Sequence, residues 1–232
     1  MTNFTQQPGT TRPIRSFVRR SGRITSAQRR ALDRYWPRFG TEPEGLLELD
    51  QLFGRCAPRY AEIGFGMGDA LIEMARGHPQ WDYLGIEVYD AGIGRLLGQL
   101  AYFDLDNVRV VRGDAAEVLA TSIPDQSLDG ILLFFPDPWP KRRHHKRRLV
   151  QPPFVSLVCA KLQPGGIFHL ATDLEDYAWQ MLAVLEREPA LQNAADASRF
   201  SLRPTSRPIT KFERHGLASG CSVWELMFRR VT

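Results

Sequence analysis

The chain has 232 residues, 43% of them hydrophobic, which suits one globular unit with a substantial core. No stretch has the length of an apolar membrane span, the N-terminus lacks the apolar region of a secretory signal, and the three cysteines show no zinc spacing. These features predict a reduced, cytoplasmic protein with neither a membrane segment nor a bound metal.

The net charge of +4 conceals two strongly basic stretches. Residues 1–41 contain nine Arg and a single acid, Asp33, and residues 141–148 contain six Lys or Arg, so the rest of the chain carries a net charge of −10. Two basic patches on an acidic body favour a polyanionic partner, because each Lys or Arg placed at a phosphate releases counterions. The first patch can also be described as a disordered tail, which can still bind nucleic acid.

The elements are predicted from the spacing of apolar residues. Residues 1–25 are polar and show no sustained periodicity, and residues 26–40 predict a short helix with Ser26 as N-cap, closed before Pro37. Strands are expected at residues 59–64, 82–88, 107–114, 128–138, 167–173, 199–203 and 222–230, and helices at residues 69–79, 91–104, 115–123, 152–166 and 174–188. We therefore expect an Arg-rich, partly disordered arm (residues 1–50) and one folded domain (residues 51–232).

Strands that alternate with helices predict an α/β fold with a doubly wound, mostly parallel sheet covered on both faces. The unbroken apolar run from Ile131 to Phe135 suits a strand that is buried on both sides. No helix separates the last two strands, so they are expected to pair antiparallel at one edge of the sheet.

Five consecutive predicted strands finish in or just before a carboxylate. These acids are Glu62, Glu87, Asp114, Asp137 and Asp173. In an open parallel sheet, ligands bind outside the carboxyl ends of the strands. Acids gathered there would repel one another, so a cationic or hydroxyl-rich ligand is expected between them. Taken one at a time, each acid could instead be a helix N-cap or a solvated loop end.

The loop after the first of these strands, "EIGFGMGDA", indicates a nucleotide-type ligand. Gly64, Gly66 and Gly68 permit a tight turn and a close approach of backbone to ligand, and a helix begins directly after them. Glu87 follows Gly64 by 23 residues, the usual interval for a carboxylate that accepts both ribose hydroxyls. This pattern suits NAD as well as S-adenosylmethionine.

The acids favour S-adenosylmethionine. Glu62 would place negative charge beside the pyrophosphate of NAD, whereas the ammonium and sulfonium groups of S-adenosylmethionine are attracted to carboxylates. Asp114 is then placed to accept from an adenine amino group. A nicotinamide-dependent oxidoreductase remains the first alternative, although it gives the basic run no use.

The segment "FFPDPWPKRRHHKRR" follows the most buried predicted strand. Prolines on both sides of Asp137 fix its backbone, and Trp139 offers a face on which a base can stack. The basic run from Lys141 to Arg148 then supplies phosphate contacts. Together these features favour a reaction on a nucleic-acid base, while the plainer alternative is a proline turn before an exposed charged helix. His144 and His145, set among six cations, are expected to have lowered basicity and to contact RNA.

The segments "EIGFGMG", "IEV", "GDA", "FPDPWPKRRHHKRR", "TD" and "TKFE" occur in this order. In this the chain resembles the bacterial tRNA (guanine-N7-)-methyltransferases, from about residue 58 to the C-terminus. The resemblance implies a Rossmann-like class I methyltransferase domain, S-adenosyl-L-methionine as cofactor, and tRNA as partner. The methylated base would be a guanosine of the variable loop, at tRNA position 46. A monomer and a homodimer both remain open.

The resemblance also implies roles for individual residues. Asp137 would be catalytic, and the cofactor would contact Glu62, Gly64, Gly66, Gly68, Glu87, Asp114 and Asp137. The substrate would contact Lys141, Asp173, Thr210, Lys211, Phe212 and Glu213, and RNA would contact Arg143, His144, His145, Lys146, Arg147 and Arg148. No metal ligand is expected.

The chemistry of the base agrees with these roles. Guanine N7 carries a lone pair and no proton, so its attack on a sulfonium methyl group needs no general base. We therefore expect Asp137 to orient the guanine and to offset its developing positive charge. Lys141 is expected on a phosphate or on O6, because a donor on N7 would block the reaction. A second alternative is an RNA-binding protein without activity.

Overall fold

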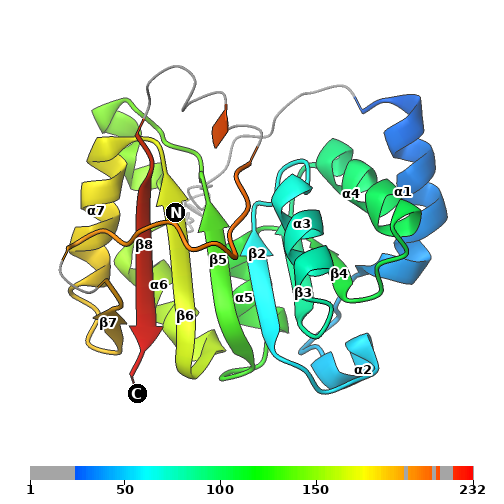
Figure 1. The fold of residues 1–232 in the computed structure, drawn as a ribbon, viewed down its shortest axis with the longest axis horizontal. Helices are drawn as coiled ribbons and strands as arrows, with labels where there is room; N and C mark the ends of the chain where they lie inside the picture. Colours follow the sequence, from blue (N-terminus) through cyan, green and yellow to red (C-terminus); the bar gives the residue numbers. More distant parts are fainter. Residues whose placement is uncertain (1–23, 196–197, 211–212, 215–221, 232) are drawn as a thin grey trace, which may run out of the picture.

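A single mixed sheet forms the centre of the computed structural model, which describes residues 24–195, 198–210, 213–214 and 222–231 (Figure 1). Its strand order is β1-β4-β3-β2-β5-β6-β8-β7. The pairs from β1 to β6 are parallel, and β8 is antiparallel to both β6 and β7. The strands are β1 (Gly40–Thr41), β2 (Arg59–Ile63), β3 (Asp82–Glu87), β4 (Val108–Arg112), β5 (Leu128–Phe134), β6 (Leu162–Thr172), β7 (Leu191–Asn193) and β8 (Trp224–Arg230). The predicted α/β class and the antiparallel edge are confirmed.

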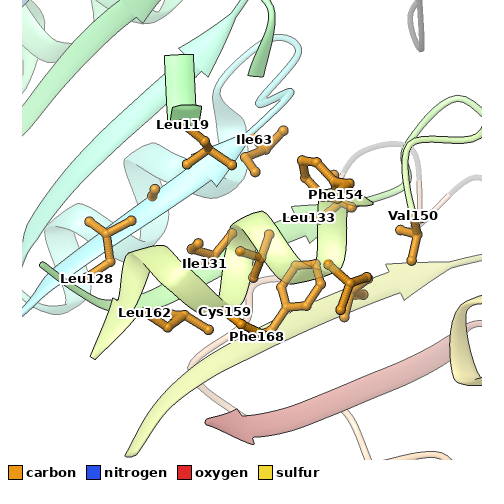
Figure 2. Close-up of a cluster of buried hydrophobic side chains, with 14 of the residues drawn as sticks. Ile63, Leu119, Leu128, Ile131, Leu133, Val150, Phe154, Cys159, Leu162 and Phe168 are labelled. Atoms are coloured by element: carbon orange, nitrogen blue, oxygen red, sulfur yellow. The ribbon is translucent and has the colours of Figure 1, made fainter. Parts of the chain in front are cut away.

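Helices cover both faces of the sheet because each buried strand presents apolar side chains alternately to the two sides. Ile131 and Leu133 of β5 belong to the core beneath α5, α6 and α7, shown in Figure 2, whereas Leu132 and Phe134 belong to the core beneath α1, α3 and α4. The helices are α1 (Ser26–Phe39), α2 (Leu49–Phe53), α3 (Asp69–Gly77), α4 (Asp90–Tyr102), α5 (Ala115–Ser122), α6 (Pro152–Lys161) and α7 (Glu175–Leu185), with a 3₁₀ helix, η1, at Arg142–Arg147.

The direction of winding reverses beside β2. From β2 the chain adds β3 and β4 on one side, and it then crosses to β5 on the other side. A crevice outside the carboxyl ends of β2, β3 and β5 is therefore expected to hold a ligand.

The first helix differs from its prediction at both ends. Its N-cap is Thr25, whose Oγ1 accepts from the Gln28 N–H while Gln28 Oε1 accepts from the Thr25 N–H, a capping box that displaces Ser26 to the first helical position. The helix also continues through Pro37 to Phe39, because Pro37 costs only one hydrogen bond near the end of a helix packed on α4. Helix α1 and strand β1 come from the stretch predicted as an arm, whose residues 1–23 lie outside the described residues.

The predicted strand at residues 199–203 is wrong. Only an isolated bridge pairs Ser201 with Glu225, the next residue Leu202 is 92% exposed, and Pro204 ends any continuation of the ladder. The antiparallel partner of β8 at the edge is instead the short strand β7, which pairs Leu191 with Arg230.

Candidate active site

A pocket opens at the reversal point of the sheet. Its lining residues come from the ends of β2, β3 and β5, from the loops after β2, β3, β4 and β5, from the start of α5 and from the segment after η1: Ile63, Gly64, Gly66, Ile86, Glu87, Val88, Tyr89, Gly113, Ala115, Leu133, Phe135, Pro136, Asp137 and Leu149. The structure thus brings Gly64, Gly66, Glu87 and Asp137 together as predicted, with carboxylates set between apolar walls. Such a lining suits a ligand that is partly apolar and carries hydroxyl or cationic groups.

The glycine loop adopts a shape that only glycine tolerates well. Gly64, Gly66 and Gly68 all have positive φ, at 70°, 58° and 79°. The loop is fastened by Glu87, whose Oε2 accepts from the Gly66 N–H at 2.9 Å while its Oε1 accepts from the N–H groups of Val88 and Tyr89. Glu87 therefore shapes the pocket as well as lining it, a role that its spacing from Gly64 did not reveal.

Glu62 lies in β2, two residues before Gly64, and outside the pocket lining. Its neighbours Ala61 and Ile63 point into one core, so Glu62 points to the opposite side of β2, where it is only 3% exposed. No described protein group hydrogen-bonds to its Oε2. Burial, and secondarily the charge of Glu87, raise the pKa of Glu62 to about 8. A cation beside this carboxyl group would favour its ionised form.

Asp114 is the N-cap of α5, which is the helix-capping alternative that the sequence left open for each of these acids. Its Oδ1 accepts from the backbone N–H groups of Ala116 and Glu117 at the start of α5, and its neighbours Gly113 and Ala115 line the pocket. Asp173 is half-buried directly after β6, outside the pocket lining.

Asp137 sits in a turn with unusual backbone geometry. Phe135 and Trp139, two residues before and after it, have φ values of 51° and 43°, a region that non-glycine residues enter only under constraint. The Phe135 N–H donates to Ala171 O of β6, which anchors the start of the turn. We call residues 136–140 the proline turn. It holds Asp137 at the edge of the pocket.

The basic run forms the short helix η1 directly after the proline turn. Lys141, Arg142, Arg143, Lys146 and Arg147 are exposed, as a phosphate-binding surface requires. Partial desolvation and the surrounding cations lower the pKa of His144, as predicted.

Two side chains of the basic run also cover Trp139. The Arg147 guanidinium lies 4.9 Å from the Trp139 ring centroid, and His144 meets the same ring edge-on. A nucleic-acid base that stacks on Trp139 must therefore displace one of these side chains or stack beside them.

Comparison with known proteins identifies the family. Residues 56–226 match the model of a family described as putative methyltransferases. The tRNA (guanine-N(7)-)-methyltransferase of Alkalilimnicola ehrlichii is 60% identical over 222 residues, covering 94% of this chain and 93% of the relative, and that of Thiobacillus denitrificans is 54% identical, covering 96% and 98%.

The chain belongs to the tRNA (guanine-N(7)-)-methyltransferase family. Solved structures agree with its fold. The 16S rRNA methyltransferase KamB gives a TM-score of 0.61 at 15% identity, covering 84% of this chain and 98% of that one. An S-adenosylmethionine-dependent methyltransferase from Aquifex aeolicus gives 0.52 at 13% identity, covering 79% and 88%. The class I methyltransferase sheet predicted for the family is thereby confirmed.

The family segment "TKFE" proves to be tied to a buried ionic network. Lys211 and Phe212 lie outside the described residues, and Thr210 Oγ1 accepts from the Glu213 N–H. Glu213 is 3% exposed, and its two carboxylate oxygens accept from Arg207 at 2.7 Å each. This differs from the predicted substrate contact, because the carboxylate of Glu213 is already engaged inside the protein.

Arg207 joins this network to the sheet. Its side chain is 1% exposed, it also pairs with Glu225 of β8, and Glu225 in turn lies 2.7 Å from His169 Nε2 of β6. The guanidinium stands 5.5 Å from the Phe134 ring centroid. In Figure 1 the segment 198–210 crosses in front of β8, β6 and β5. Sequence reasoning missed this network, since no local pattern marks an arginine as buried.

Neither membrane nor metal features appear in the described part of the chain. No helix there is long and apolar enough to span a bilayer. Within those same residues, no group of three or more His, Cys, Asp or Glu side chains gathers as metal ligands would.

Glu62 leads to a prediction about pH. The folded state keeps the Glu62 proton up to about pH 8, whereas the unfolded state releases it near pH 4.5, so stability should fall as pH rises between these values. Glu62→Gln has no carboxyl group to ionise, so this loss of stability disappears. The Tm of the variant relative to that of the wild type should therefore rise with pH between these two values. Thermal unfolding without ligand from pH 5 to 9 measures it, with the exposed Glu117→Gln as control. A constant difference would contradict the prediction.

Proposed function

We propose that this protein transfers a methyl group from S-adenosyl-L-methionine to N7 of a guanosine in the tRNA variable loop, at position 46, in the cytoplasm. The observation that carries the proposal is a juxtaposition. A carboxylate-lined pocket at the reversal point of a methyltransferase sheet ends at Asp137, and five exposed cations follow within ten residues. The relatives named above support the same base and the same class of RNA.

The pocket residues fit S-adenosylmethionine. Glu87 stands at the end of β3 to accept from ribose hydroxyls, and Ile86 and Leu133 provide apolar walls for a flat ring. Glu62, whose Oε2 no described protein group satisfies, and the lining residue Asp137 favour a ligand with positive charge. We propose that Gly64, Gly66 and Gly68 let the backbone approach this ligand, and that Asp114 orients the adjacent Gly113–Ala115 backbone.

The bound cofactor supplies an electrophilic methyl group on a sulfonium cation. The guanine supplies the electron pair from N7, so the protein needs to align the two groups and stabilise charge. We assign this role to Asp137, which orients the base and stays near the positive charge that passes to the purine. Its rigid proline turn holds the carboxylate without reorganisation during the transfer.

The remaining assignments concern tRNA. We propose that Lys141, Asp173 and Thr210 contact the substrate, as Lys211 and Phe212 of the same family segment would. Arg143, Lys146 and Arg147 would bind phosphates, because they are exposed on η1. His144 and His145 flank them.

The decisive test is methyl transfer to an unmodified tRNA transcript. Labelled S-adenosylmethionine, purified protein and transcript are incubated, and the RNA is digested to nucleosides. The expected product is 7-methylguanosine at about one per tRNA, and it should be absent when the transcript carries A at position 46. Label in another nucleoside, or no transfer at all, would refute the proposal. The second outcome would favour an RNA-binding protein without activity.

The basic run predicts a specific salt dependence. Each phosphate contact contributes roughly 0.7–0.9 to the slope of log affinity against log salt concentration. Arg143→Gln combined with Lys146→Gln should therefore weaken tRNA binding and flatten this slope by roughly 1.5. Filter binding between low and moderate salt measures the slope. Arg229→Gln is the control, because Arg229 is exposed near Gly165 at the opposite end of the sheet. An unchanged slope in the double variant would contradict the assignment.

A further inference from the structure

Arg148 departs from the other cations of the basic run. Its side chain is 1% exposed, whereas the five Lys and Arg residues named above on and beside η1 are exposed. A guanidinium at this depth does not reach an RNA phosphate without leaving its site. The predicted RNA contact is therefore corrected for this residue.

The Arg148 guanidinium connects two parts of the fold that are distant in sequence. Its Nε donates to the carbonyl oxygen of Pro138 at 3.0 Å, inside the proline turn. Its Nη2 donates to both carboxylate oxygens of Asp176 at 3.0 and 2.9 Å, and its Nη1 donates to Gln180 Oε1 at 3.3 Å. The guanidinium also lies 4.6 Å from the ring centroid of Tyr177. Three residues of α7 thus hold one side chain whose Nε donor is aimed at the turn.

The same helix fastens the chain directly after Arg148. Gln180 Nε2 donates to Val150 O at 2.7 Å, and the Val150 N–H donates to the Tyr177 hydroxyl oxygen. Leu149 lies between the anchored residues Arg148 and Val150, and it lines the pocket together with Asp137. The segment 148–150 is therefore a rigid support on which the proline turn rests.

The turn needs such a support. Phe135 and Trp139 hold left-handed backbone conformations, which cost about 1–3 kcal/mol each and persist only where the surroundings impose them. The Phe135 N–H is anchored to β6, and the Pro138 carbonyl is anchored to Arg148. Asp137 lies between these two anchors, so its position depends on both.

We propose that Arg148 is a positioning residue for methyl transfer. By linking Pro138 to Asp176 of α7, it holds the Asp137 carboxylate in place at the edge of the pocket. The inference rests on the proposed function, since it assumes that Asp137 acts on the guanine. Arg148 itself touches neither substrate nor cofactor.

Arg148→Lys separates positioning from RNA binding. Lysine keeps the charge that a phosphate contact requires, but it cannot bind Pro138 and the Asp176 carboxylate through one planar fork. We expect kcat to fall by about 10- to 100-fold, as for a small misplacement of a reacting group. The tRNA dissociation constant should stay within about twofold and the salt slope unchanged. Arg143→Gln is expected to show the opposite pattern, with a higher KM and a flatter slope.

Two further measurements separate positioning from a loss of stability, which is expected because Arg148 is buried and its replacement loses hydrogen bonds that the guanidinium makes. Rates are taken well below each variant's Tm, and Asp176→Asn is compared with Asp176→Glu. The Asn variant should lose kcat, the Glu variant should recover part of it, and the Arg148→Lys/Asp176→Asn double variant should lose less than the two single losses combined.

Hydrogen exchange gives a readout that does not require activity. In Arg148→Lys, the amides of the non-proline residues in the range 135–141 should exchange faster while those of α1 stay unchanged. A flatter salt slope, an unchanged kcat, or unchanged exchange in the turn would overturn the proposal. If wild-type protein forms no 7-methylguanosine, the proposed function fails instead, and the exchange comparison still decides whether Arg148 holds the turn.

Discussion

Replacing Asp137 by Asn is expected to lower the rate of methyl transfer by at least about 100-fold, the loss seen when one preorganised charge-stabilising group is removed. Asn has nearly the same shape as Asp, so the proline turn and the pocket should keep their form. It lacks the negative charge that offsets the positive charge passing to the purine. Affinity for S-adenosylmethionine should fall much less, by under about tenfold, because Glu62 and Glu87 remain.

Single-turnover transfer to tRNA measures the first quantity, and calorimetric titration of the cofactor measures the second. Asp33→Asn, the same change on the exposed face of α1, serves as the control. Turnover near that of the wild type would reject the role given to Asp137. A loss of cofactor affinity as large as the loss of rate would make Asp137 a binding group rather than one that acts in the transfer step.

Gly92→Ala is expected to destabilise the protein and to disrupt the glycine loop. A Cβ atom at Gly92, in the first turn of α4, would lie 1.9 Å from the Gly66 carbonyl oxygen. This is far inside van der Waals contact, so the loop must move, and the Gly66 N–H would leave Glu87 Oε2. Overpacking of this kind costs about 1–3 kcal/mol or more, and affinity for the cofactor should fall more than about tenfold.

Gly98→Ala on the same helix is the matched control. There the added Cβ would lie 3.5 Å from Ala31 Cβ, an ordinary contact, so the better helix propensity of Ala should stabilise the protein by up to about 1 kcal/mol. Urea unfolding and cofactor titration of both variants measure the difference. Equal effects of the two substitutions would show that the approach of α4 to the glycine loop does not shape the pocket.

The main strands and helices could be predicted because their signals are local. Short apolar runs separated by helical patterns placed β2 to β6 and α3 to α7, with differences mainly at the ends of elements. The short elements β1, α2 and β7 were missed, since two to five residues carry too little periodicity. The strand predicted at residues 199–203 was wrong because its alternating apolar and polar residues do not pair along β8 beyond one isolated bridge.

The candidate site, like the main elements, could be predicted where its signals are local in the sequence. Glycines, the interval to Glu87 and the proline turn with its cations are patterns within the chain, and they indicated the pocket edge. The sequence left the capping role of Asp114 as one of two alternatives and did not indicate the double role of Glu87, because both depend on which backbone N–H groups lie beside each carboxylate. The family resemblance likewise indicated Glu213 without showing that Arg207 engages it.

The sequence by itself determined the alternation of strands and helices from β2 to α7, the row of carboxylates at the strand ends and the charge of the run after Asp137. Only the tertiary structure decided which charged side chains lie inside. Arg148 and Arg207 look like surface residues in the sequence and Glu62 looks like a ligand contact, yet each is nearly fully buried. The physical reason is that burial depends on what distant segments place beside a residue: β3 and β5 on either side of Glu62, α7 beside Arg148, and two glutamates around Arg207.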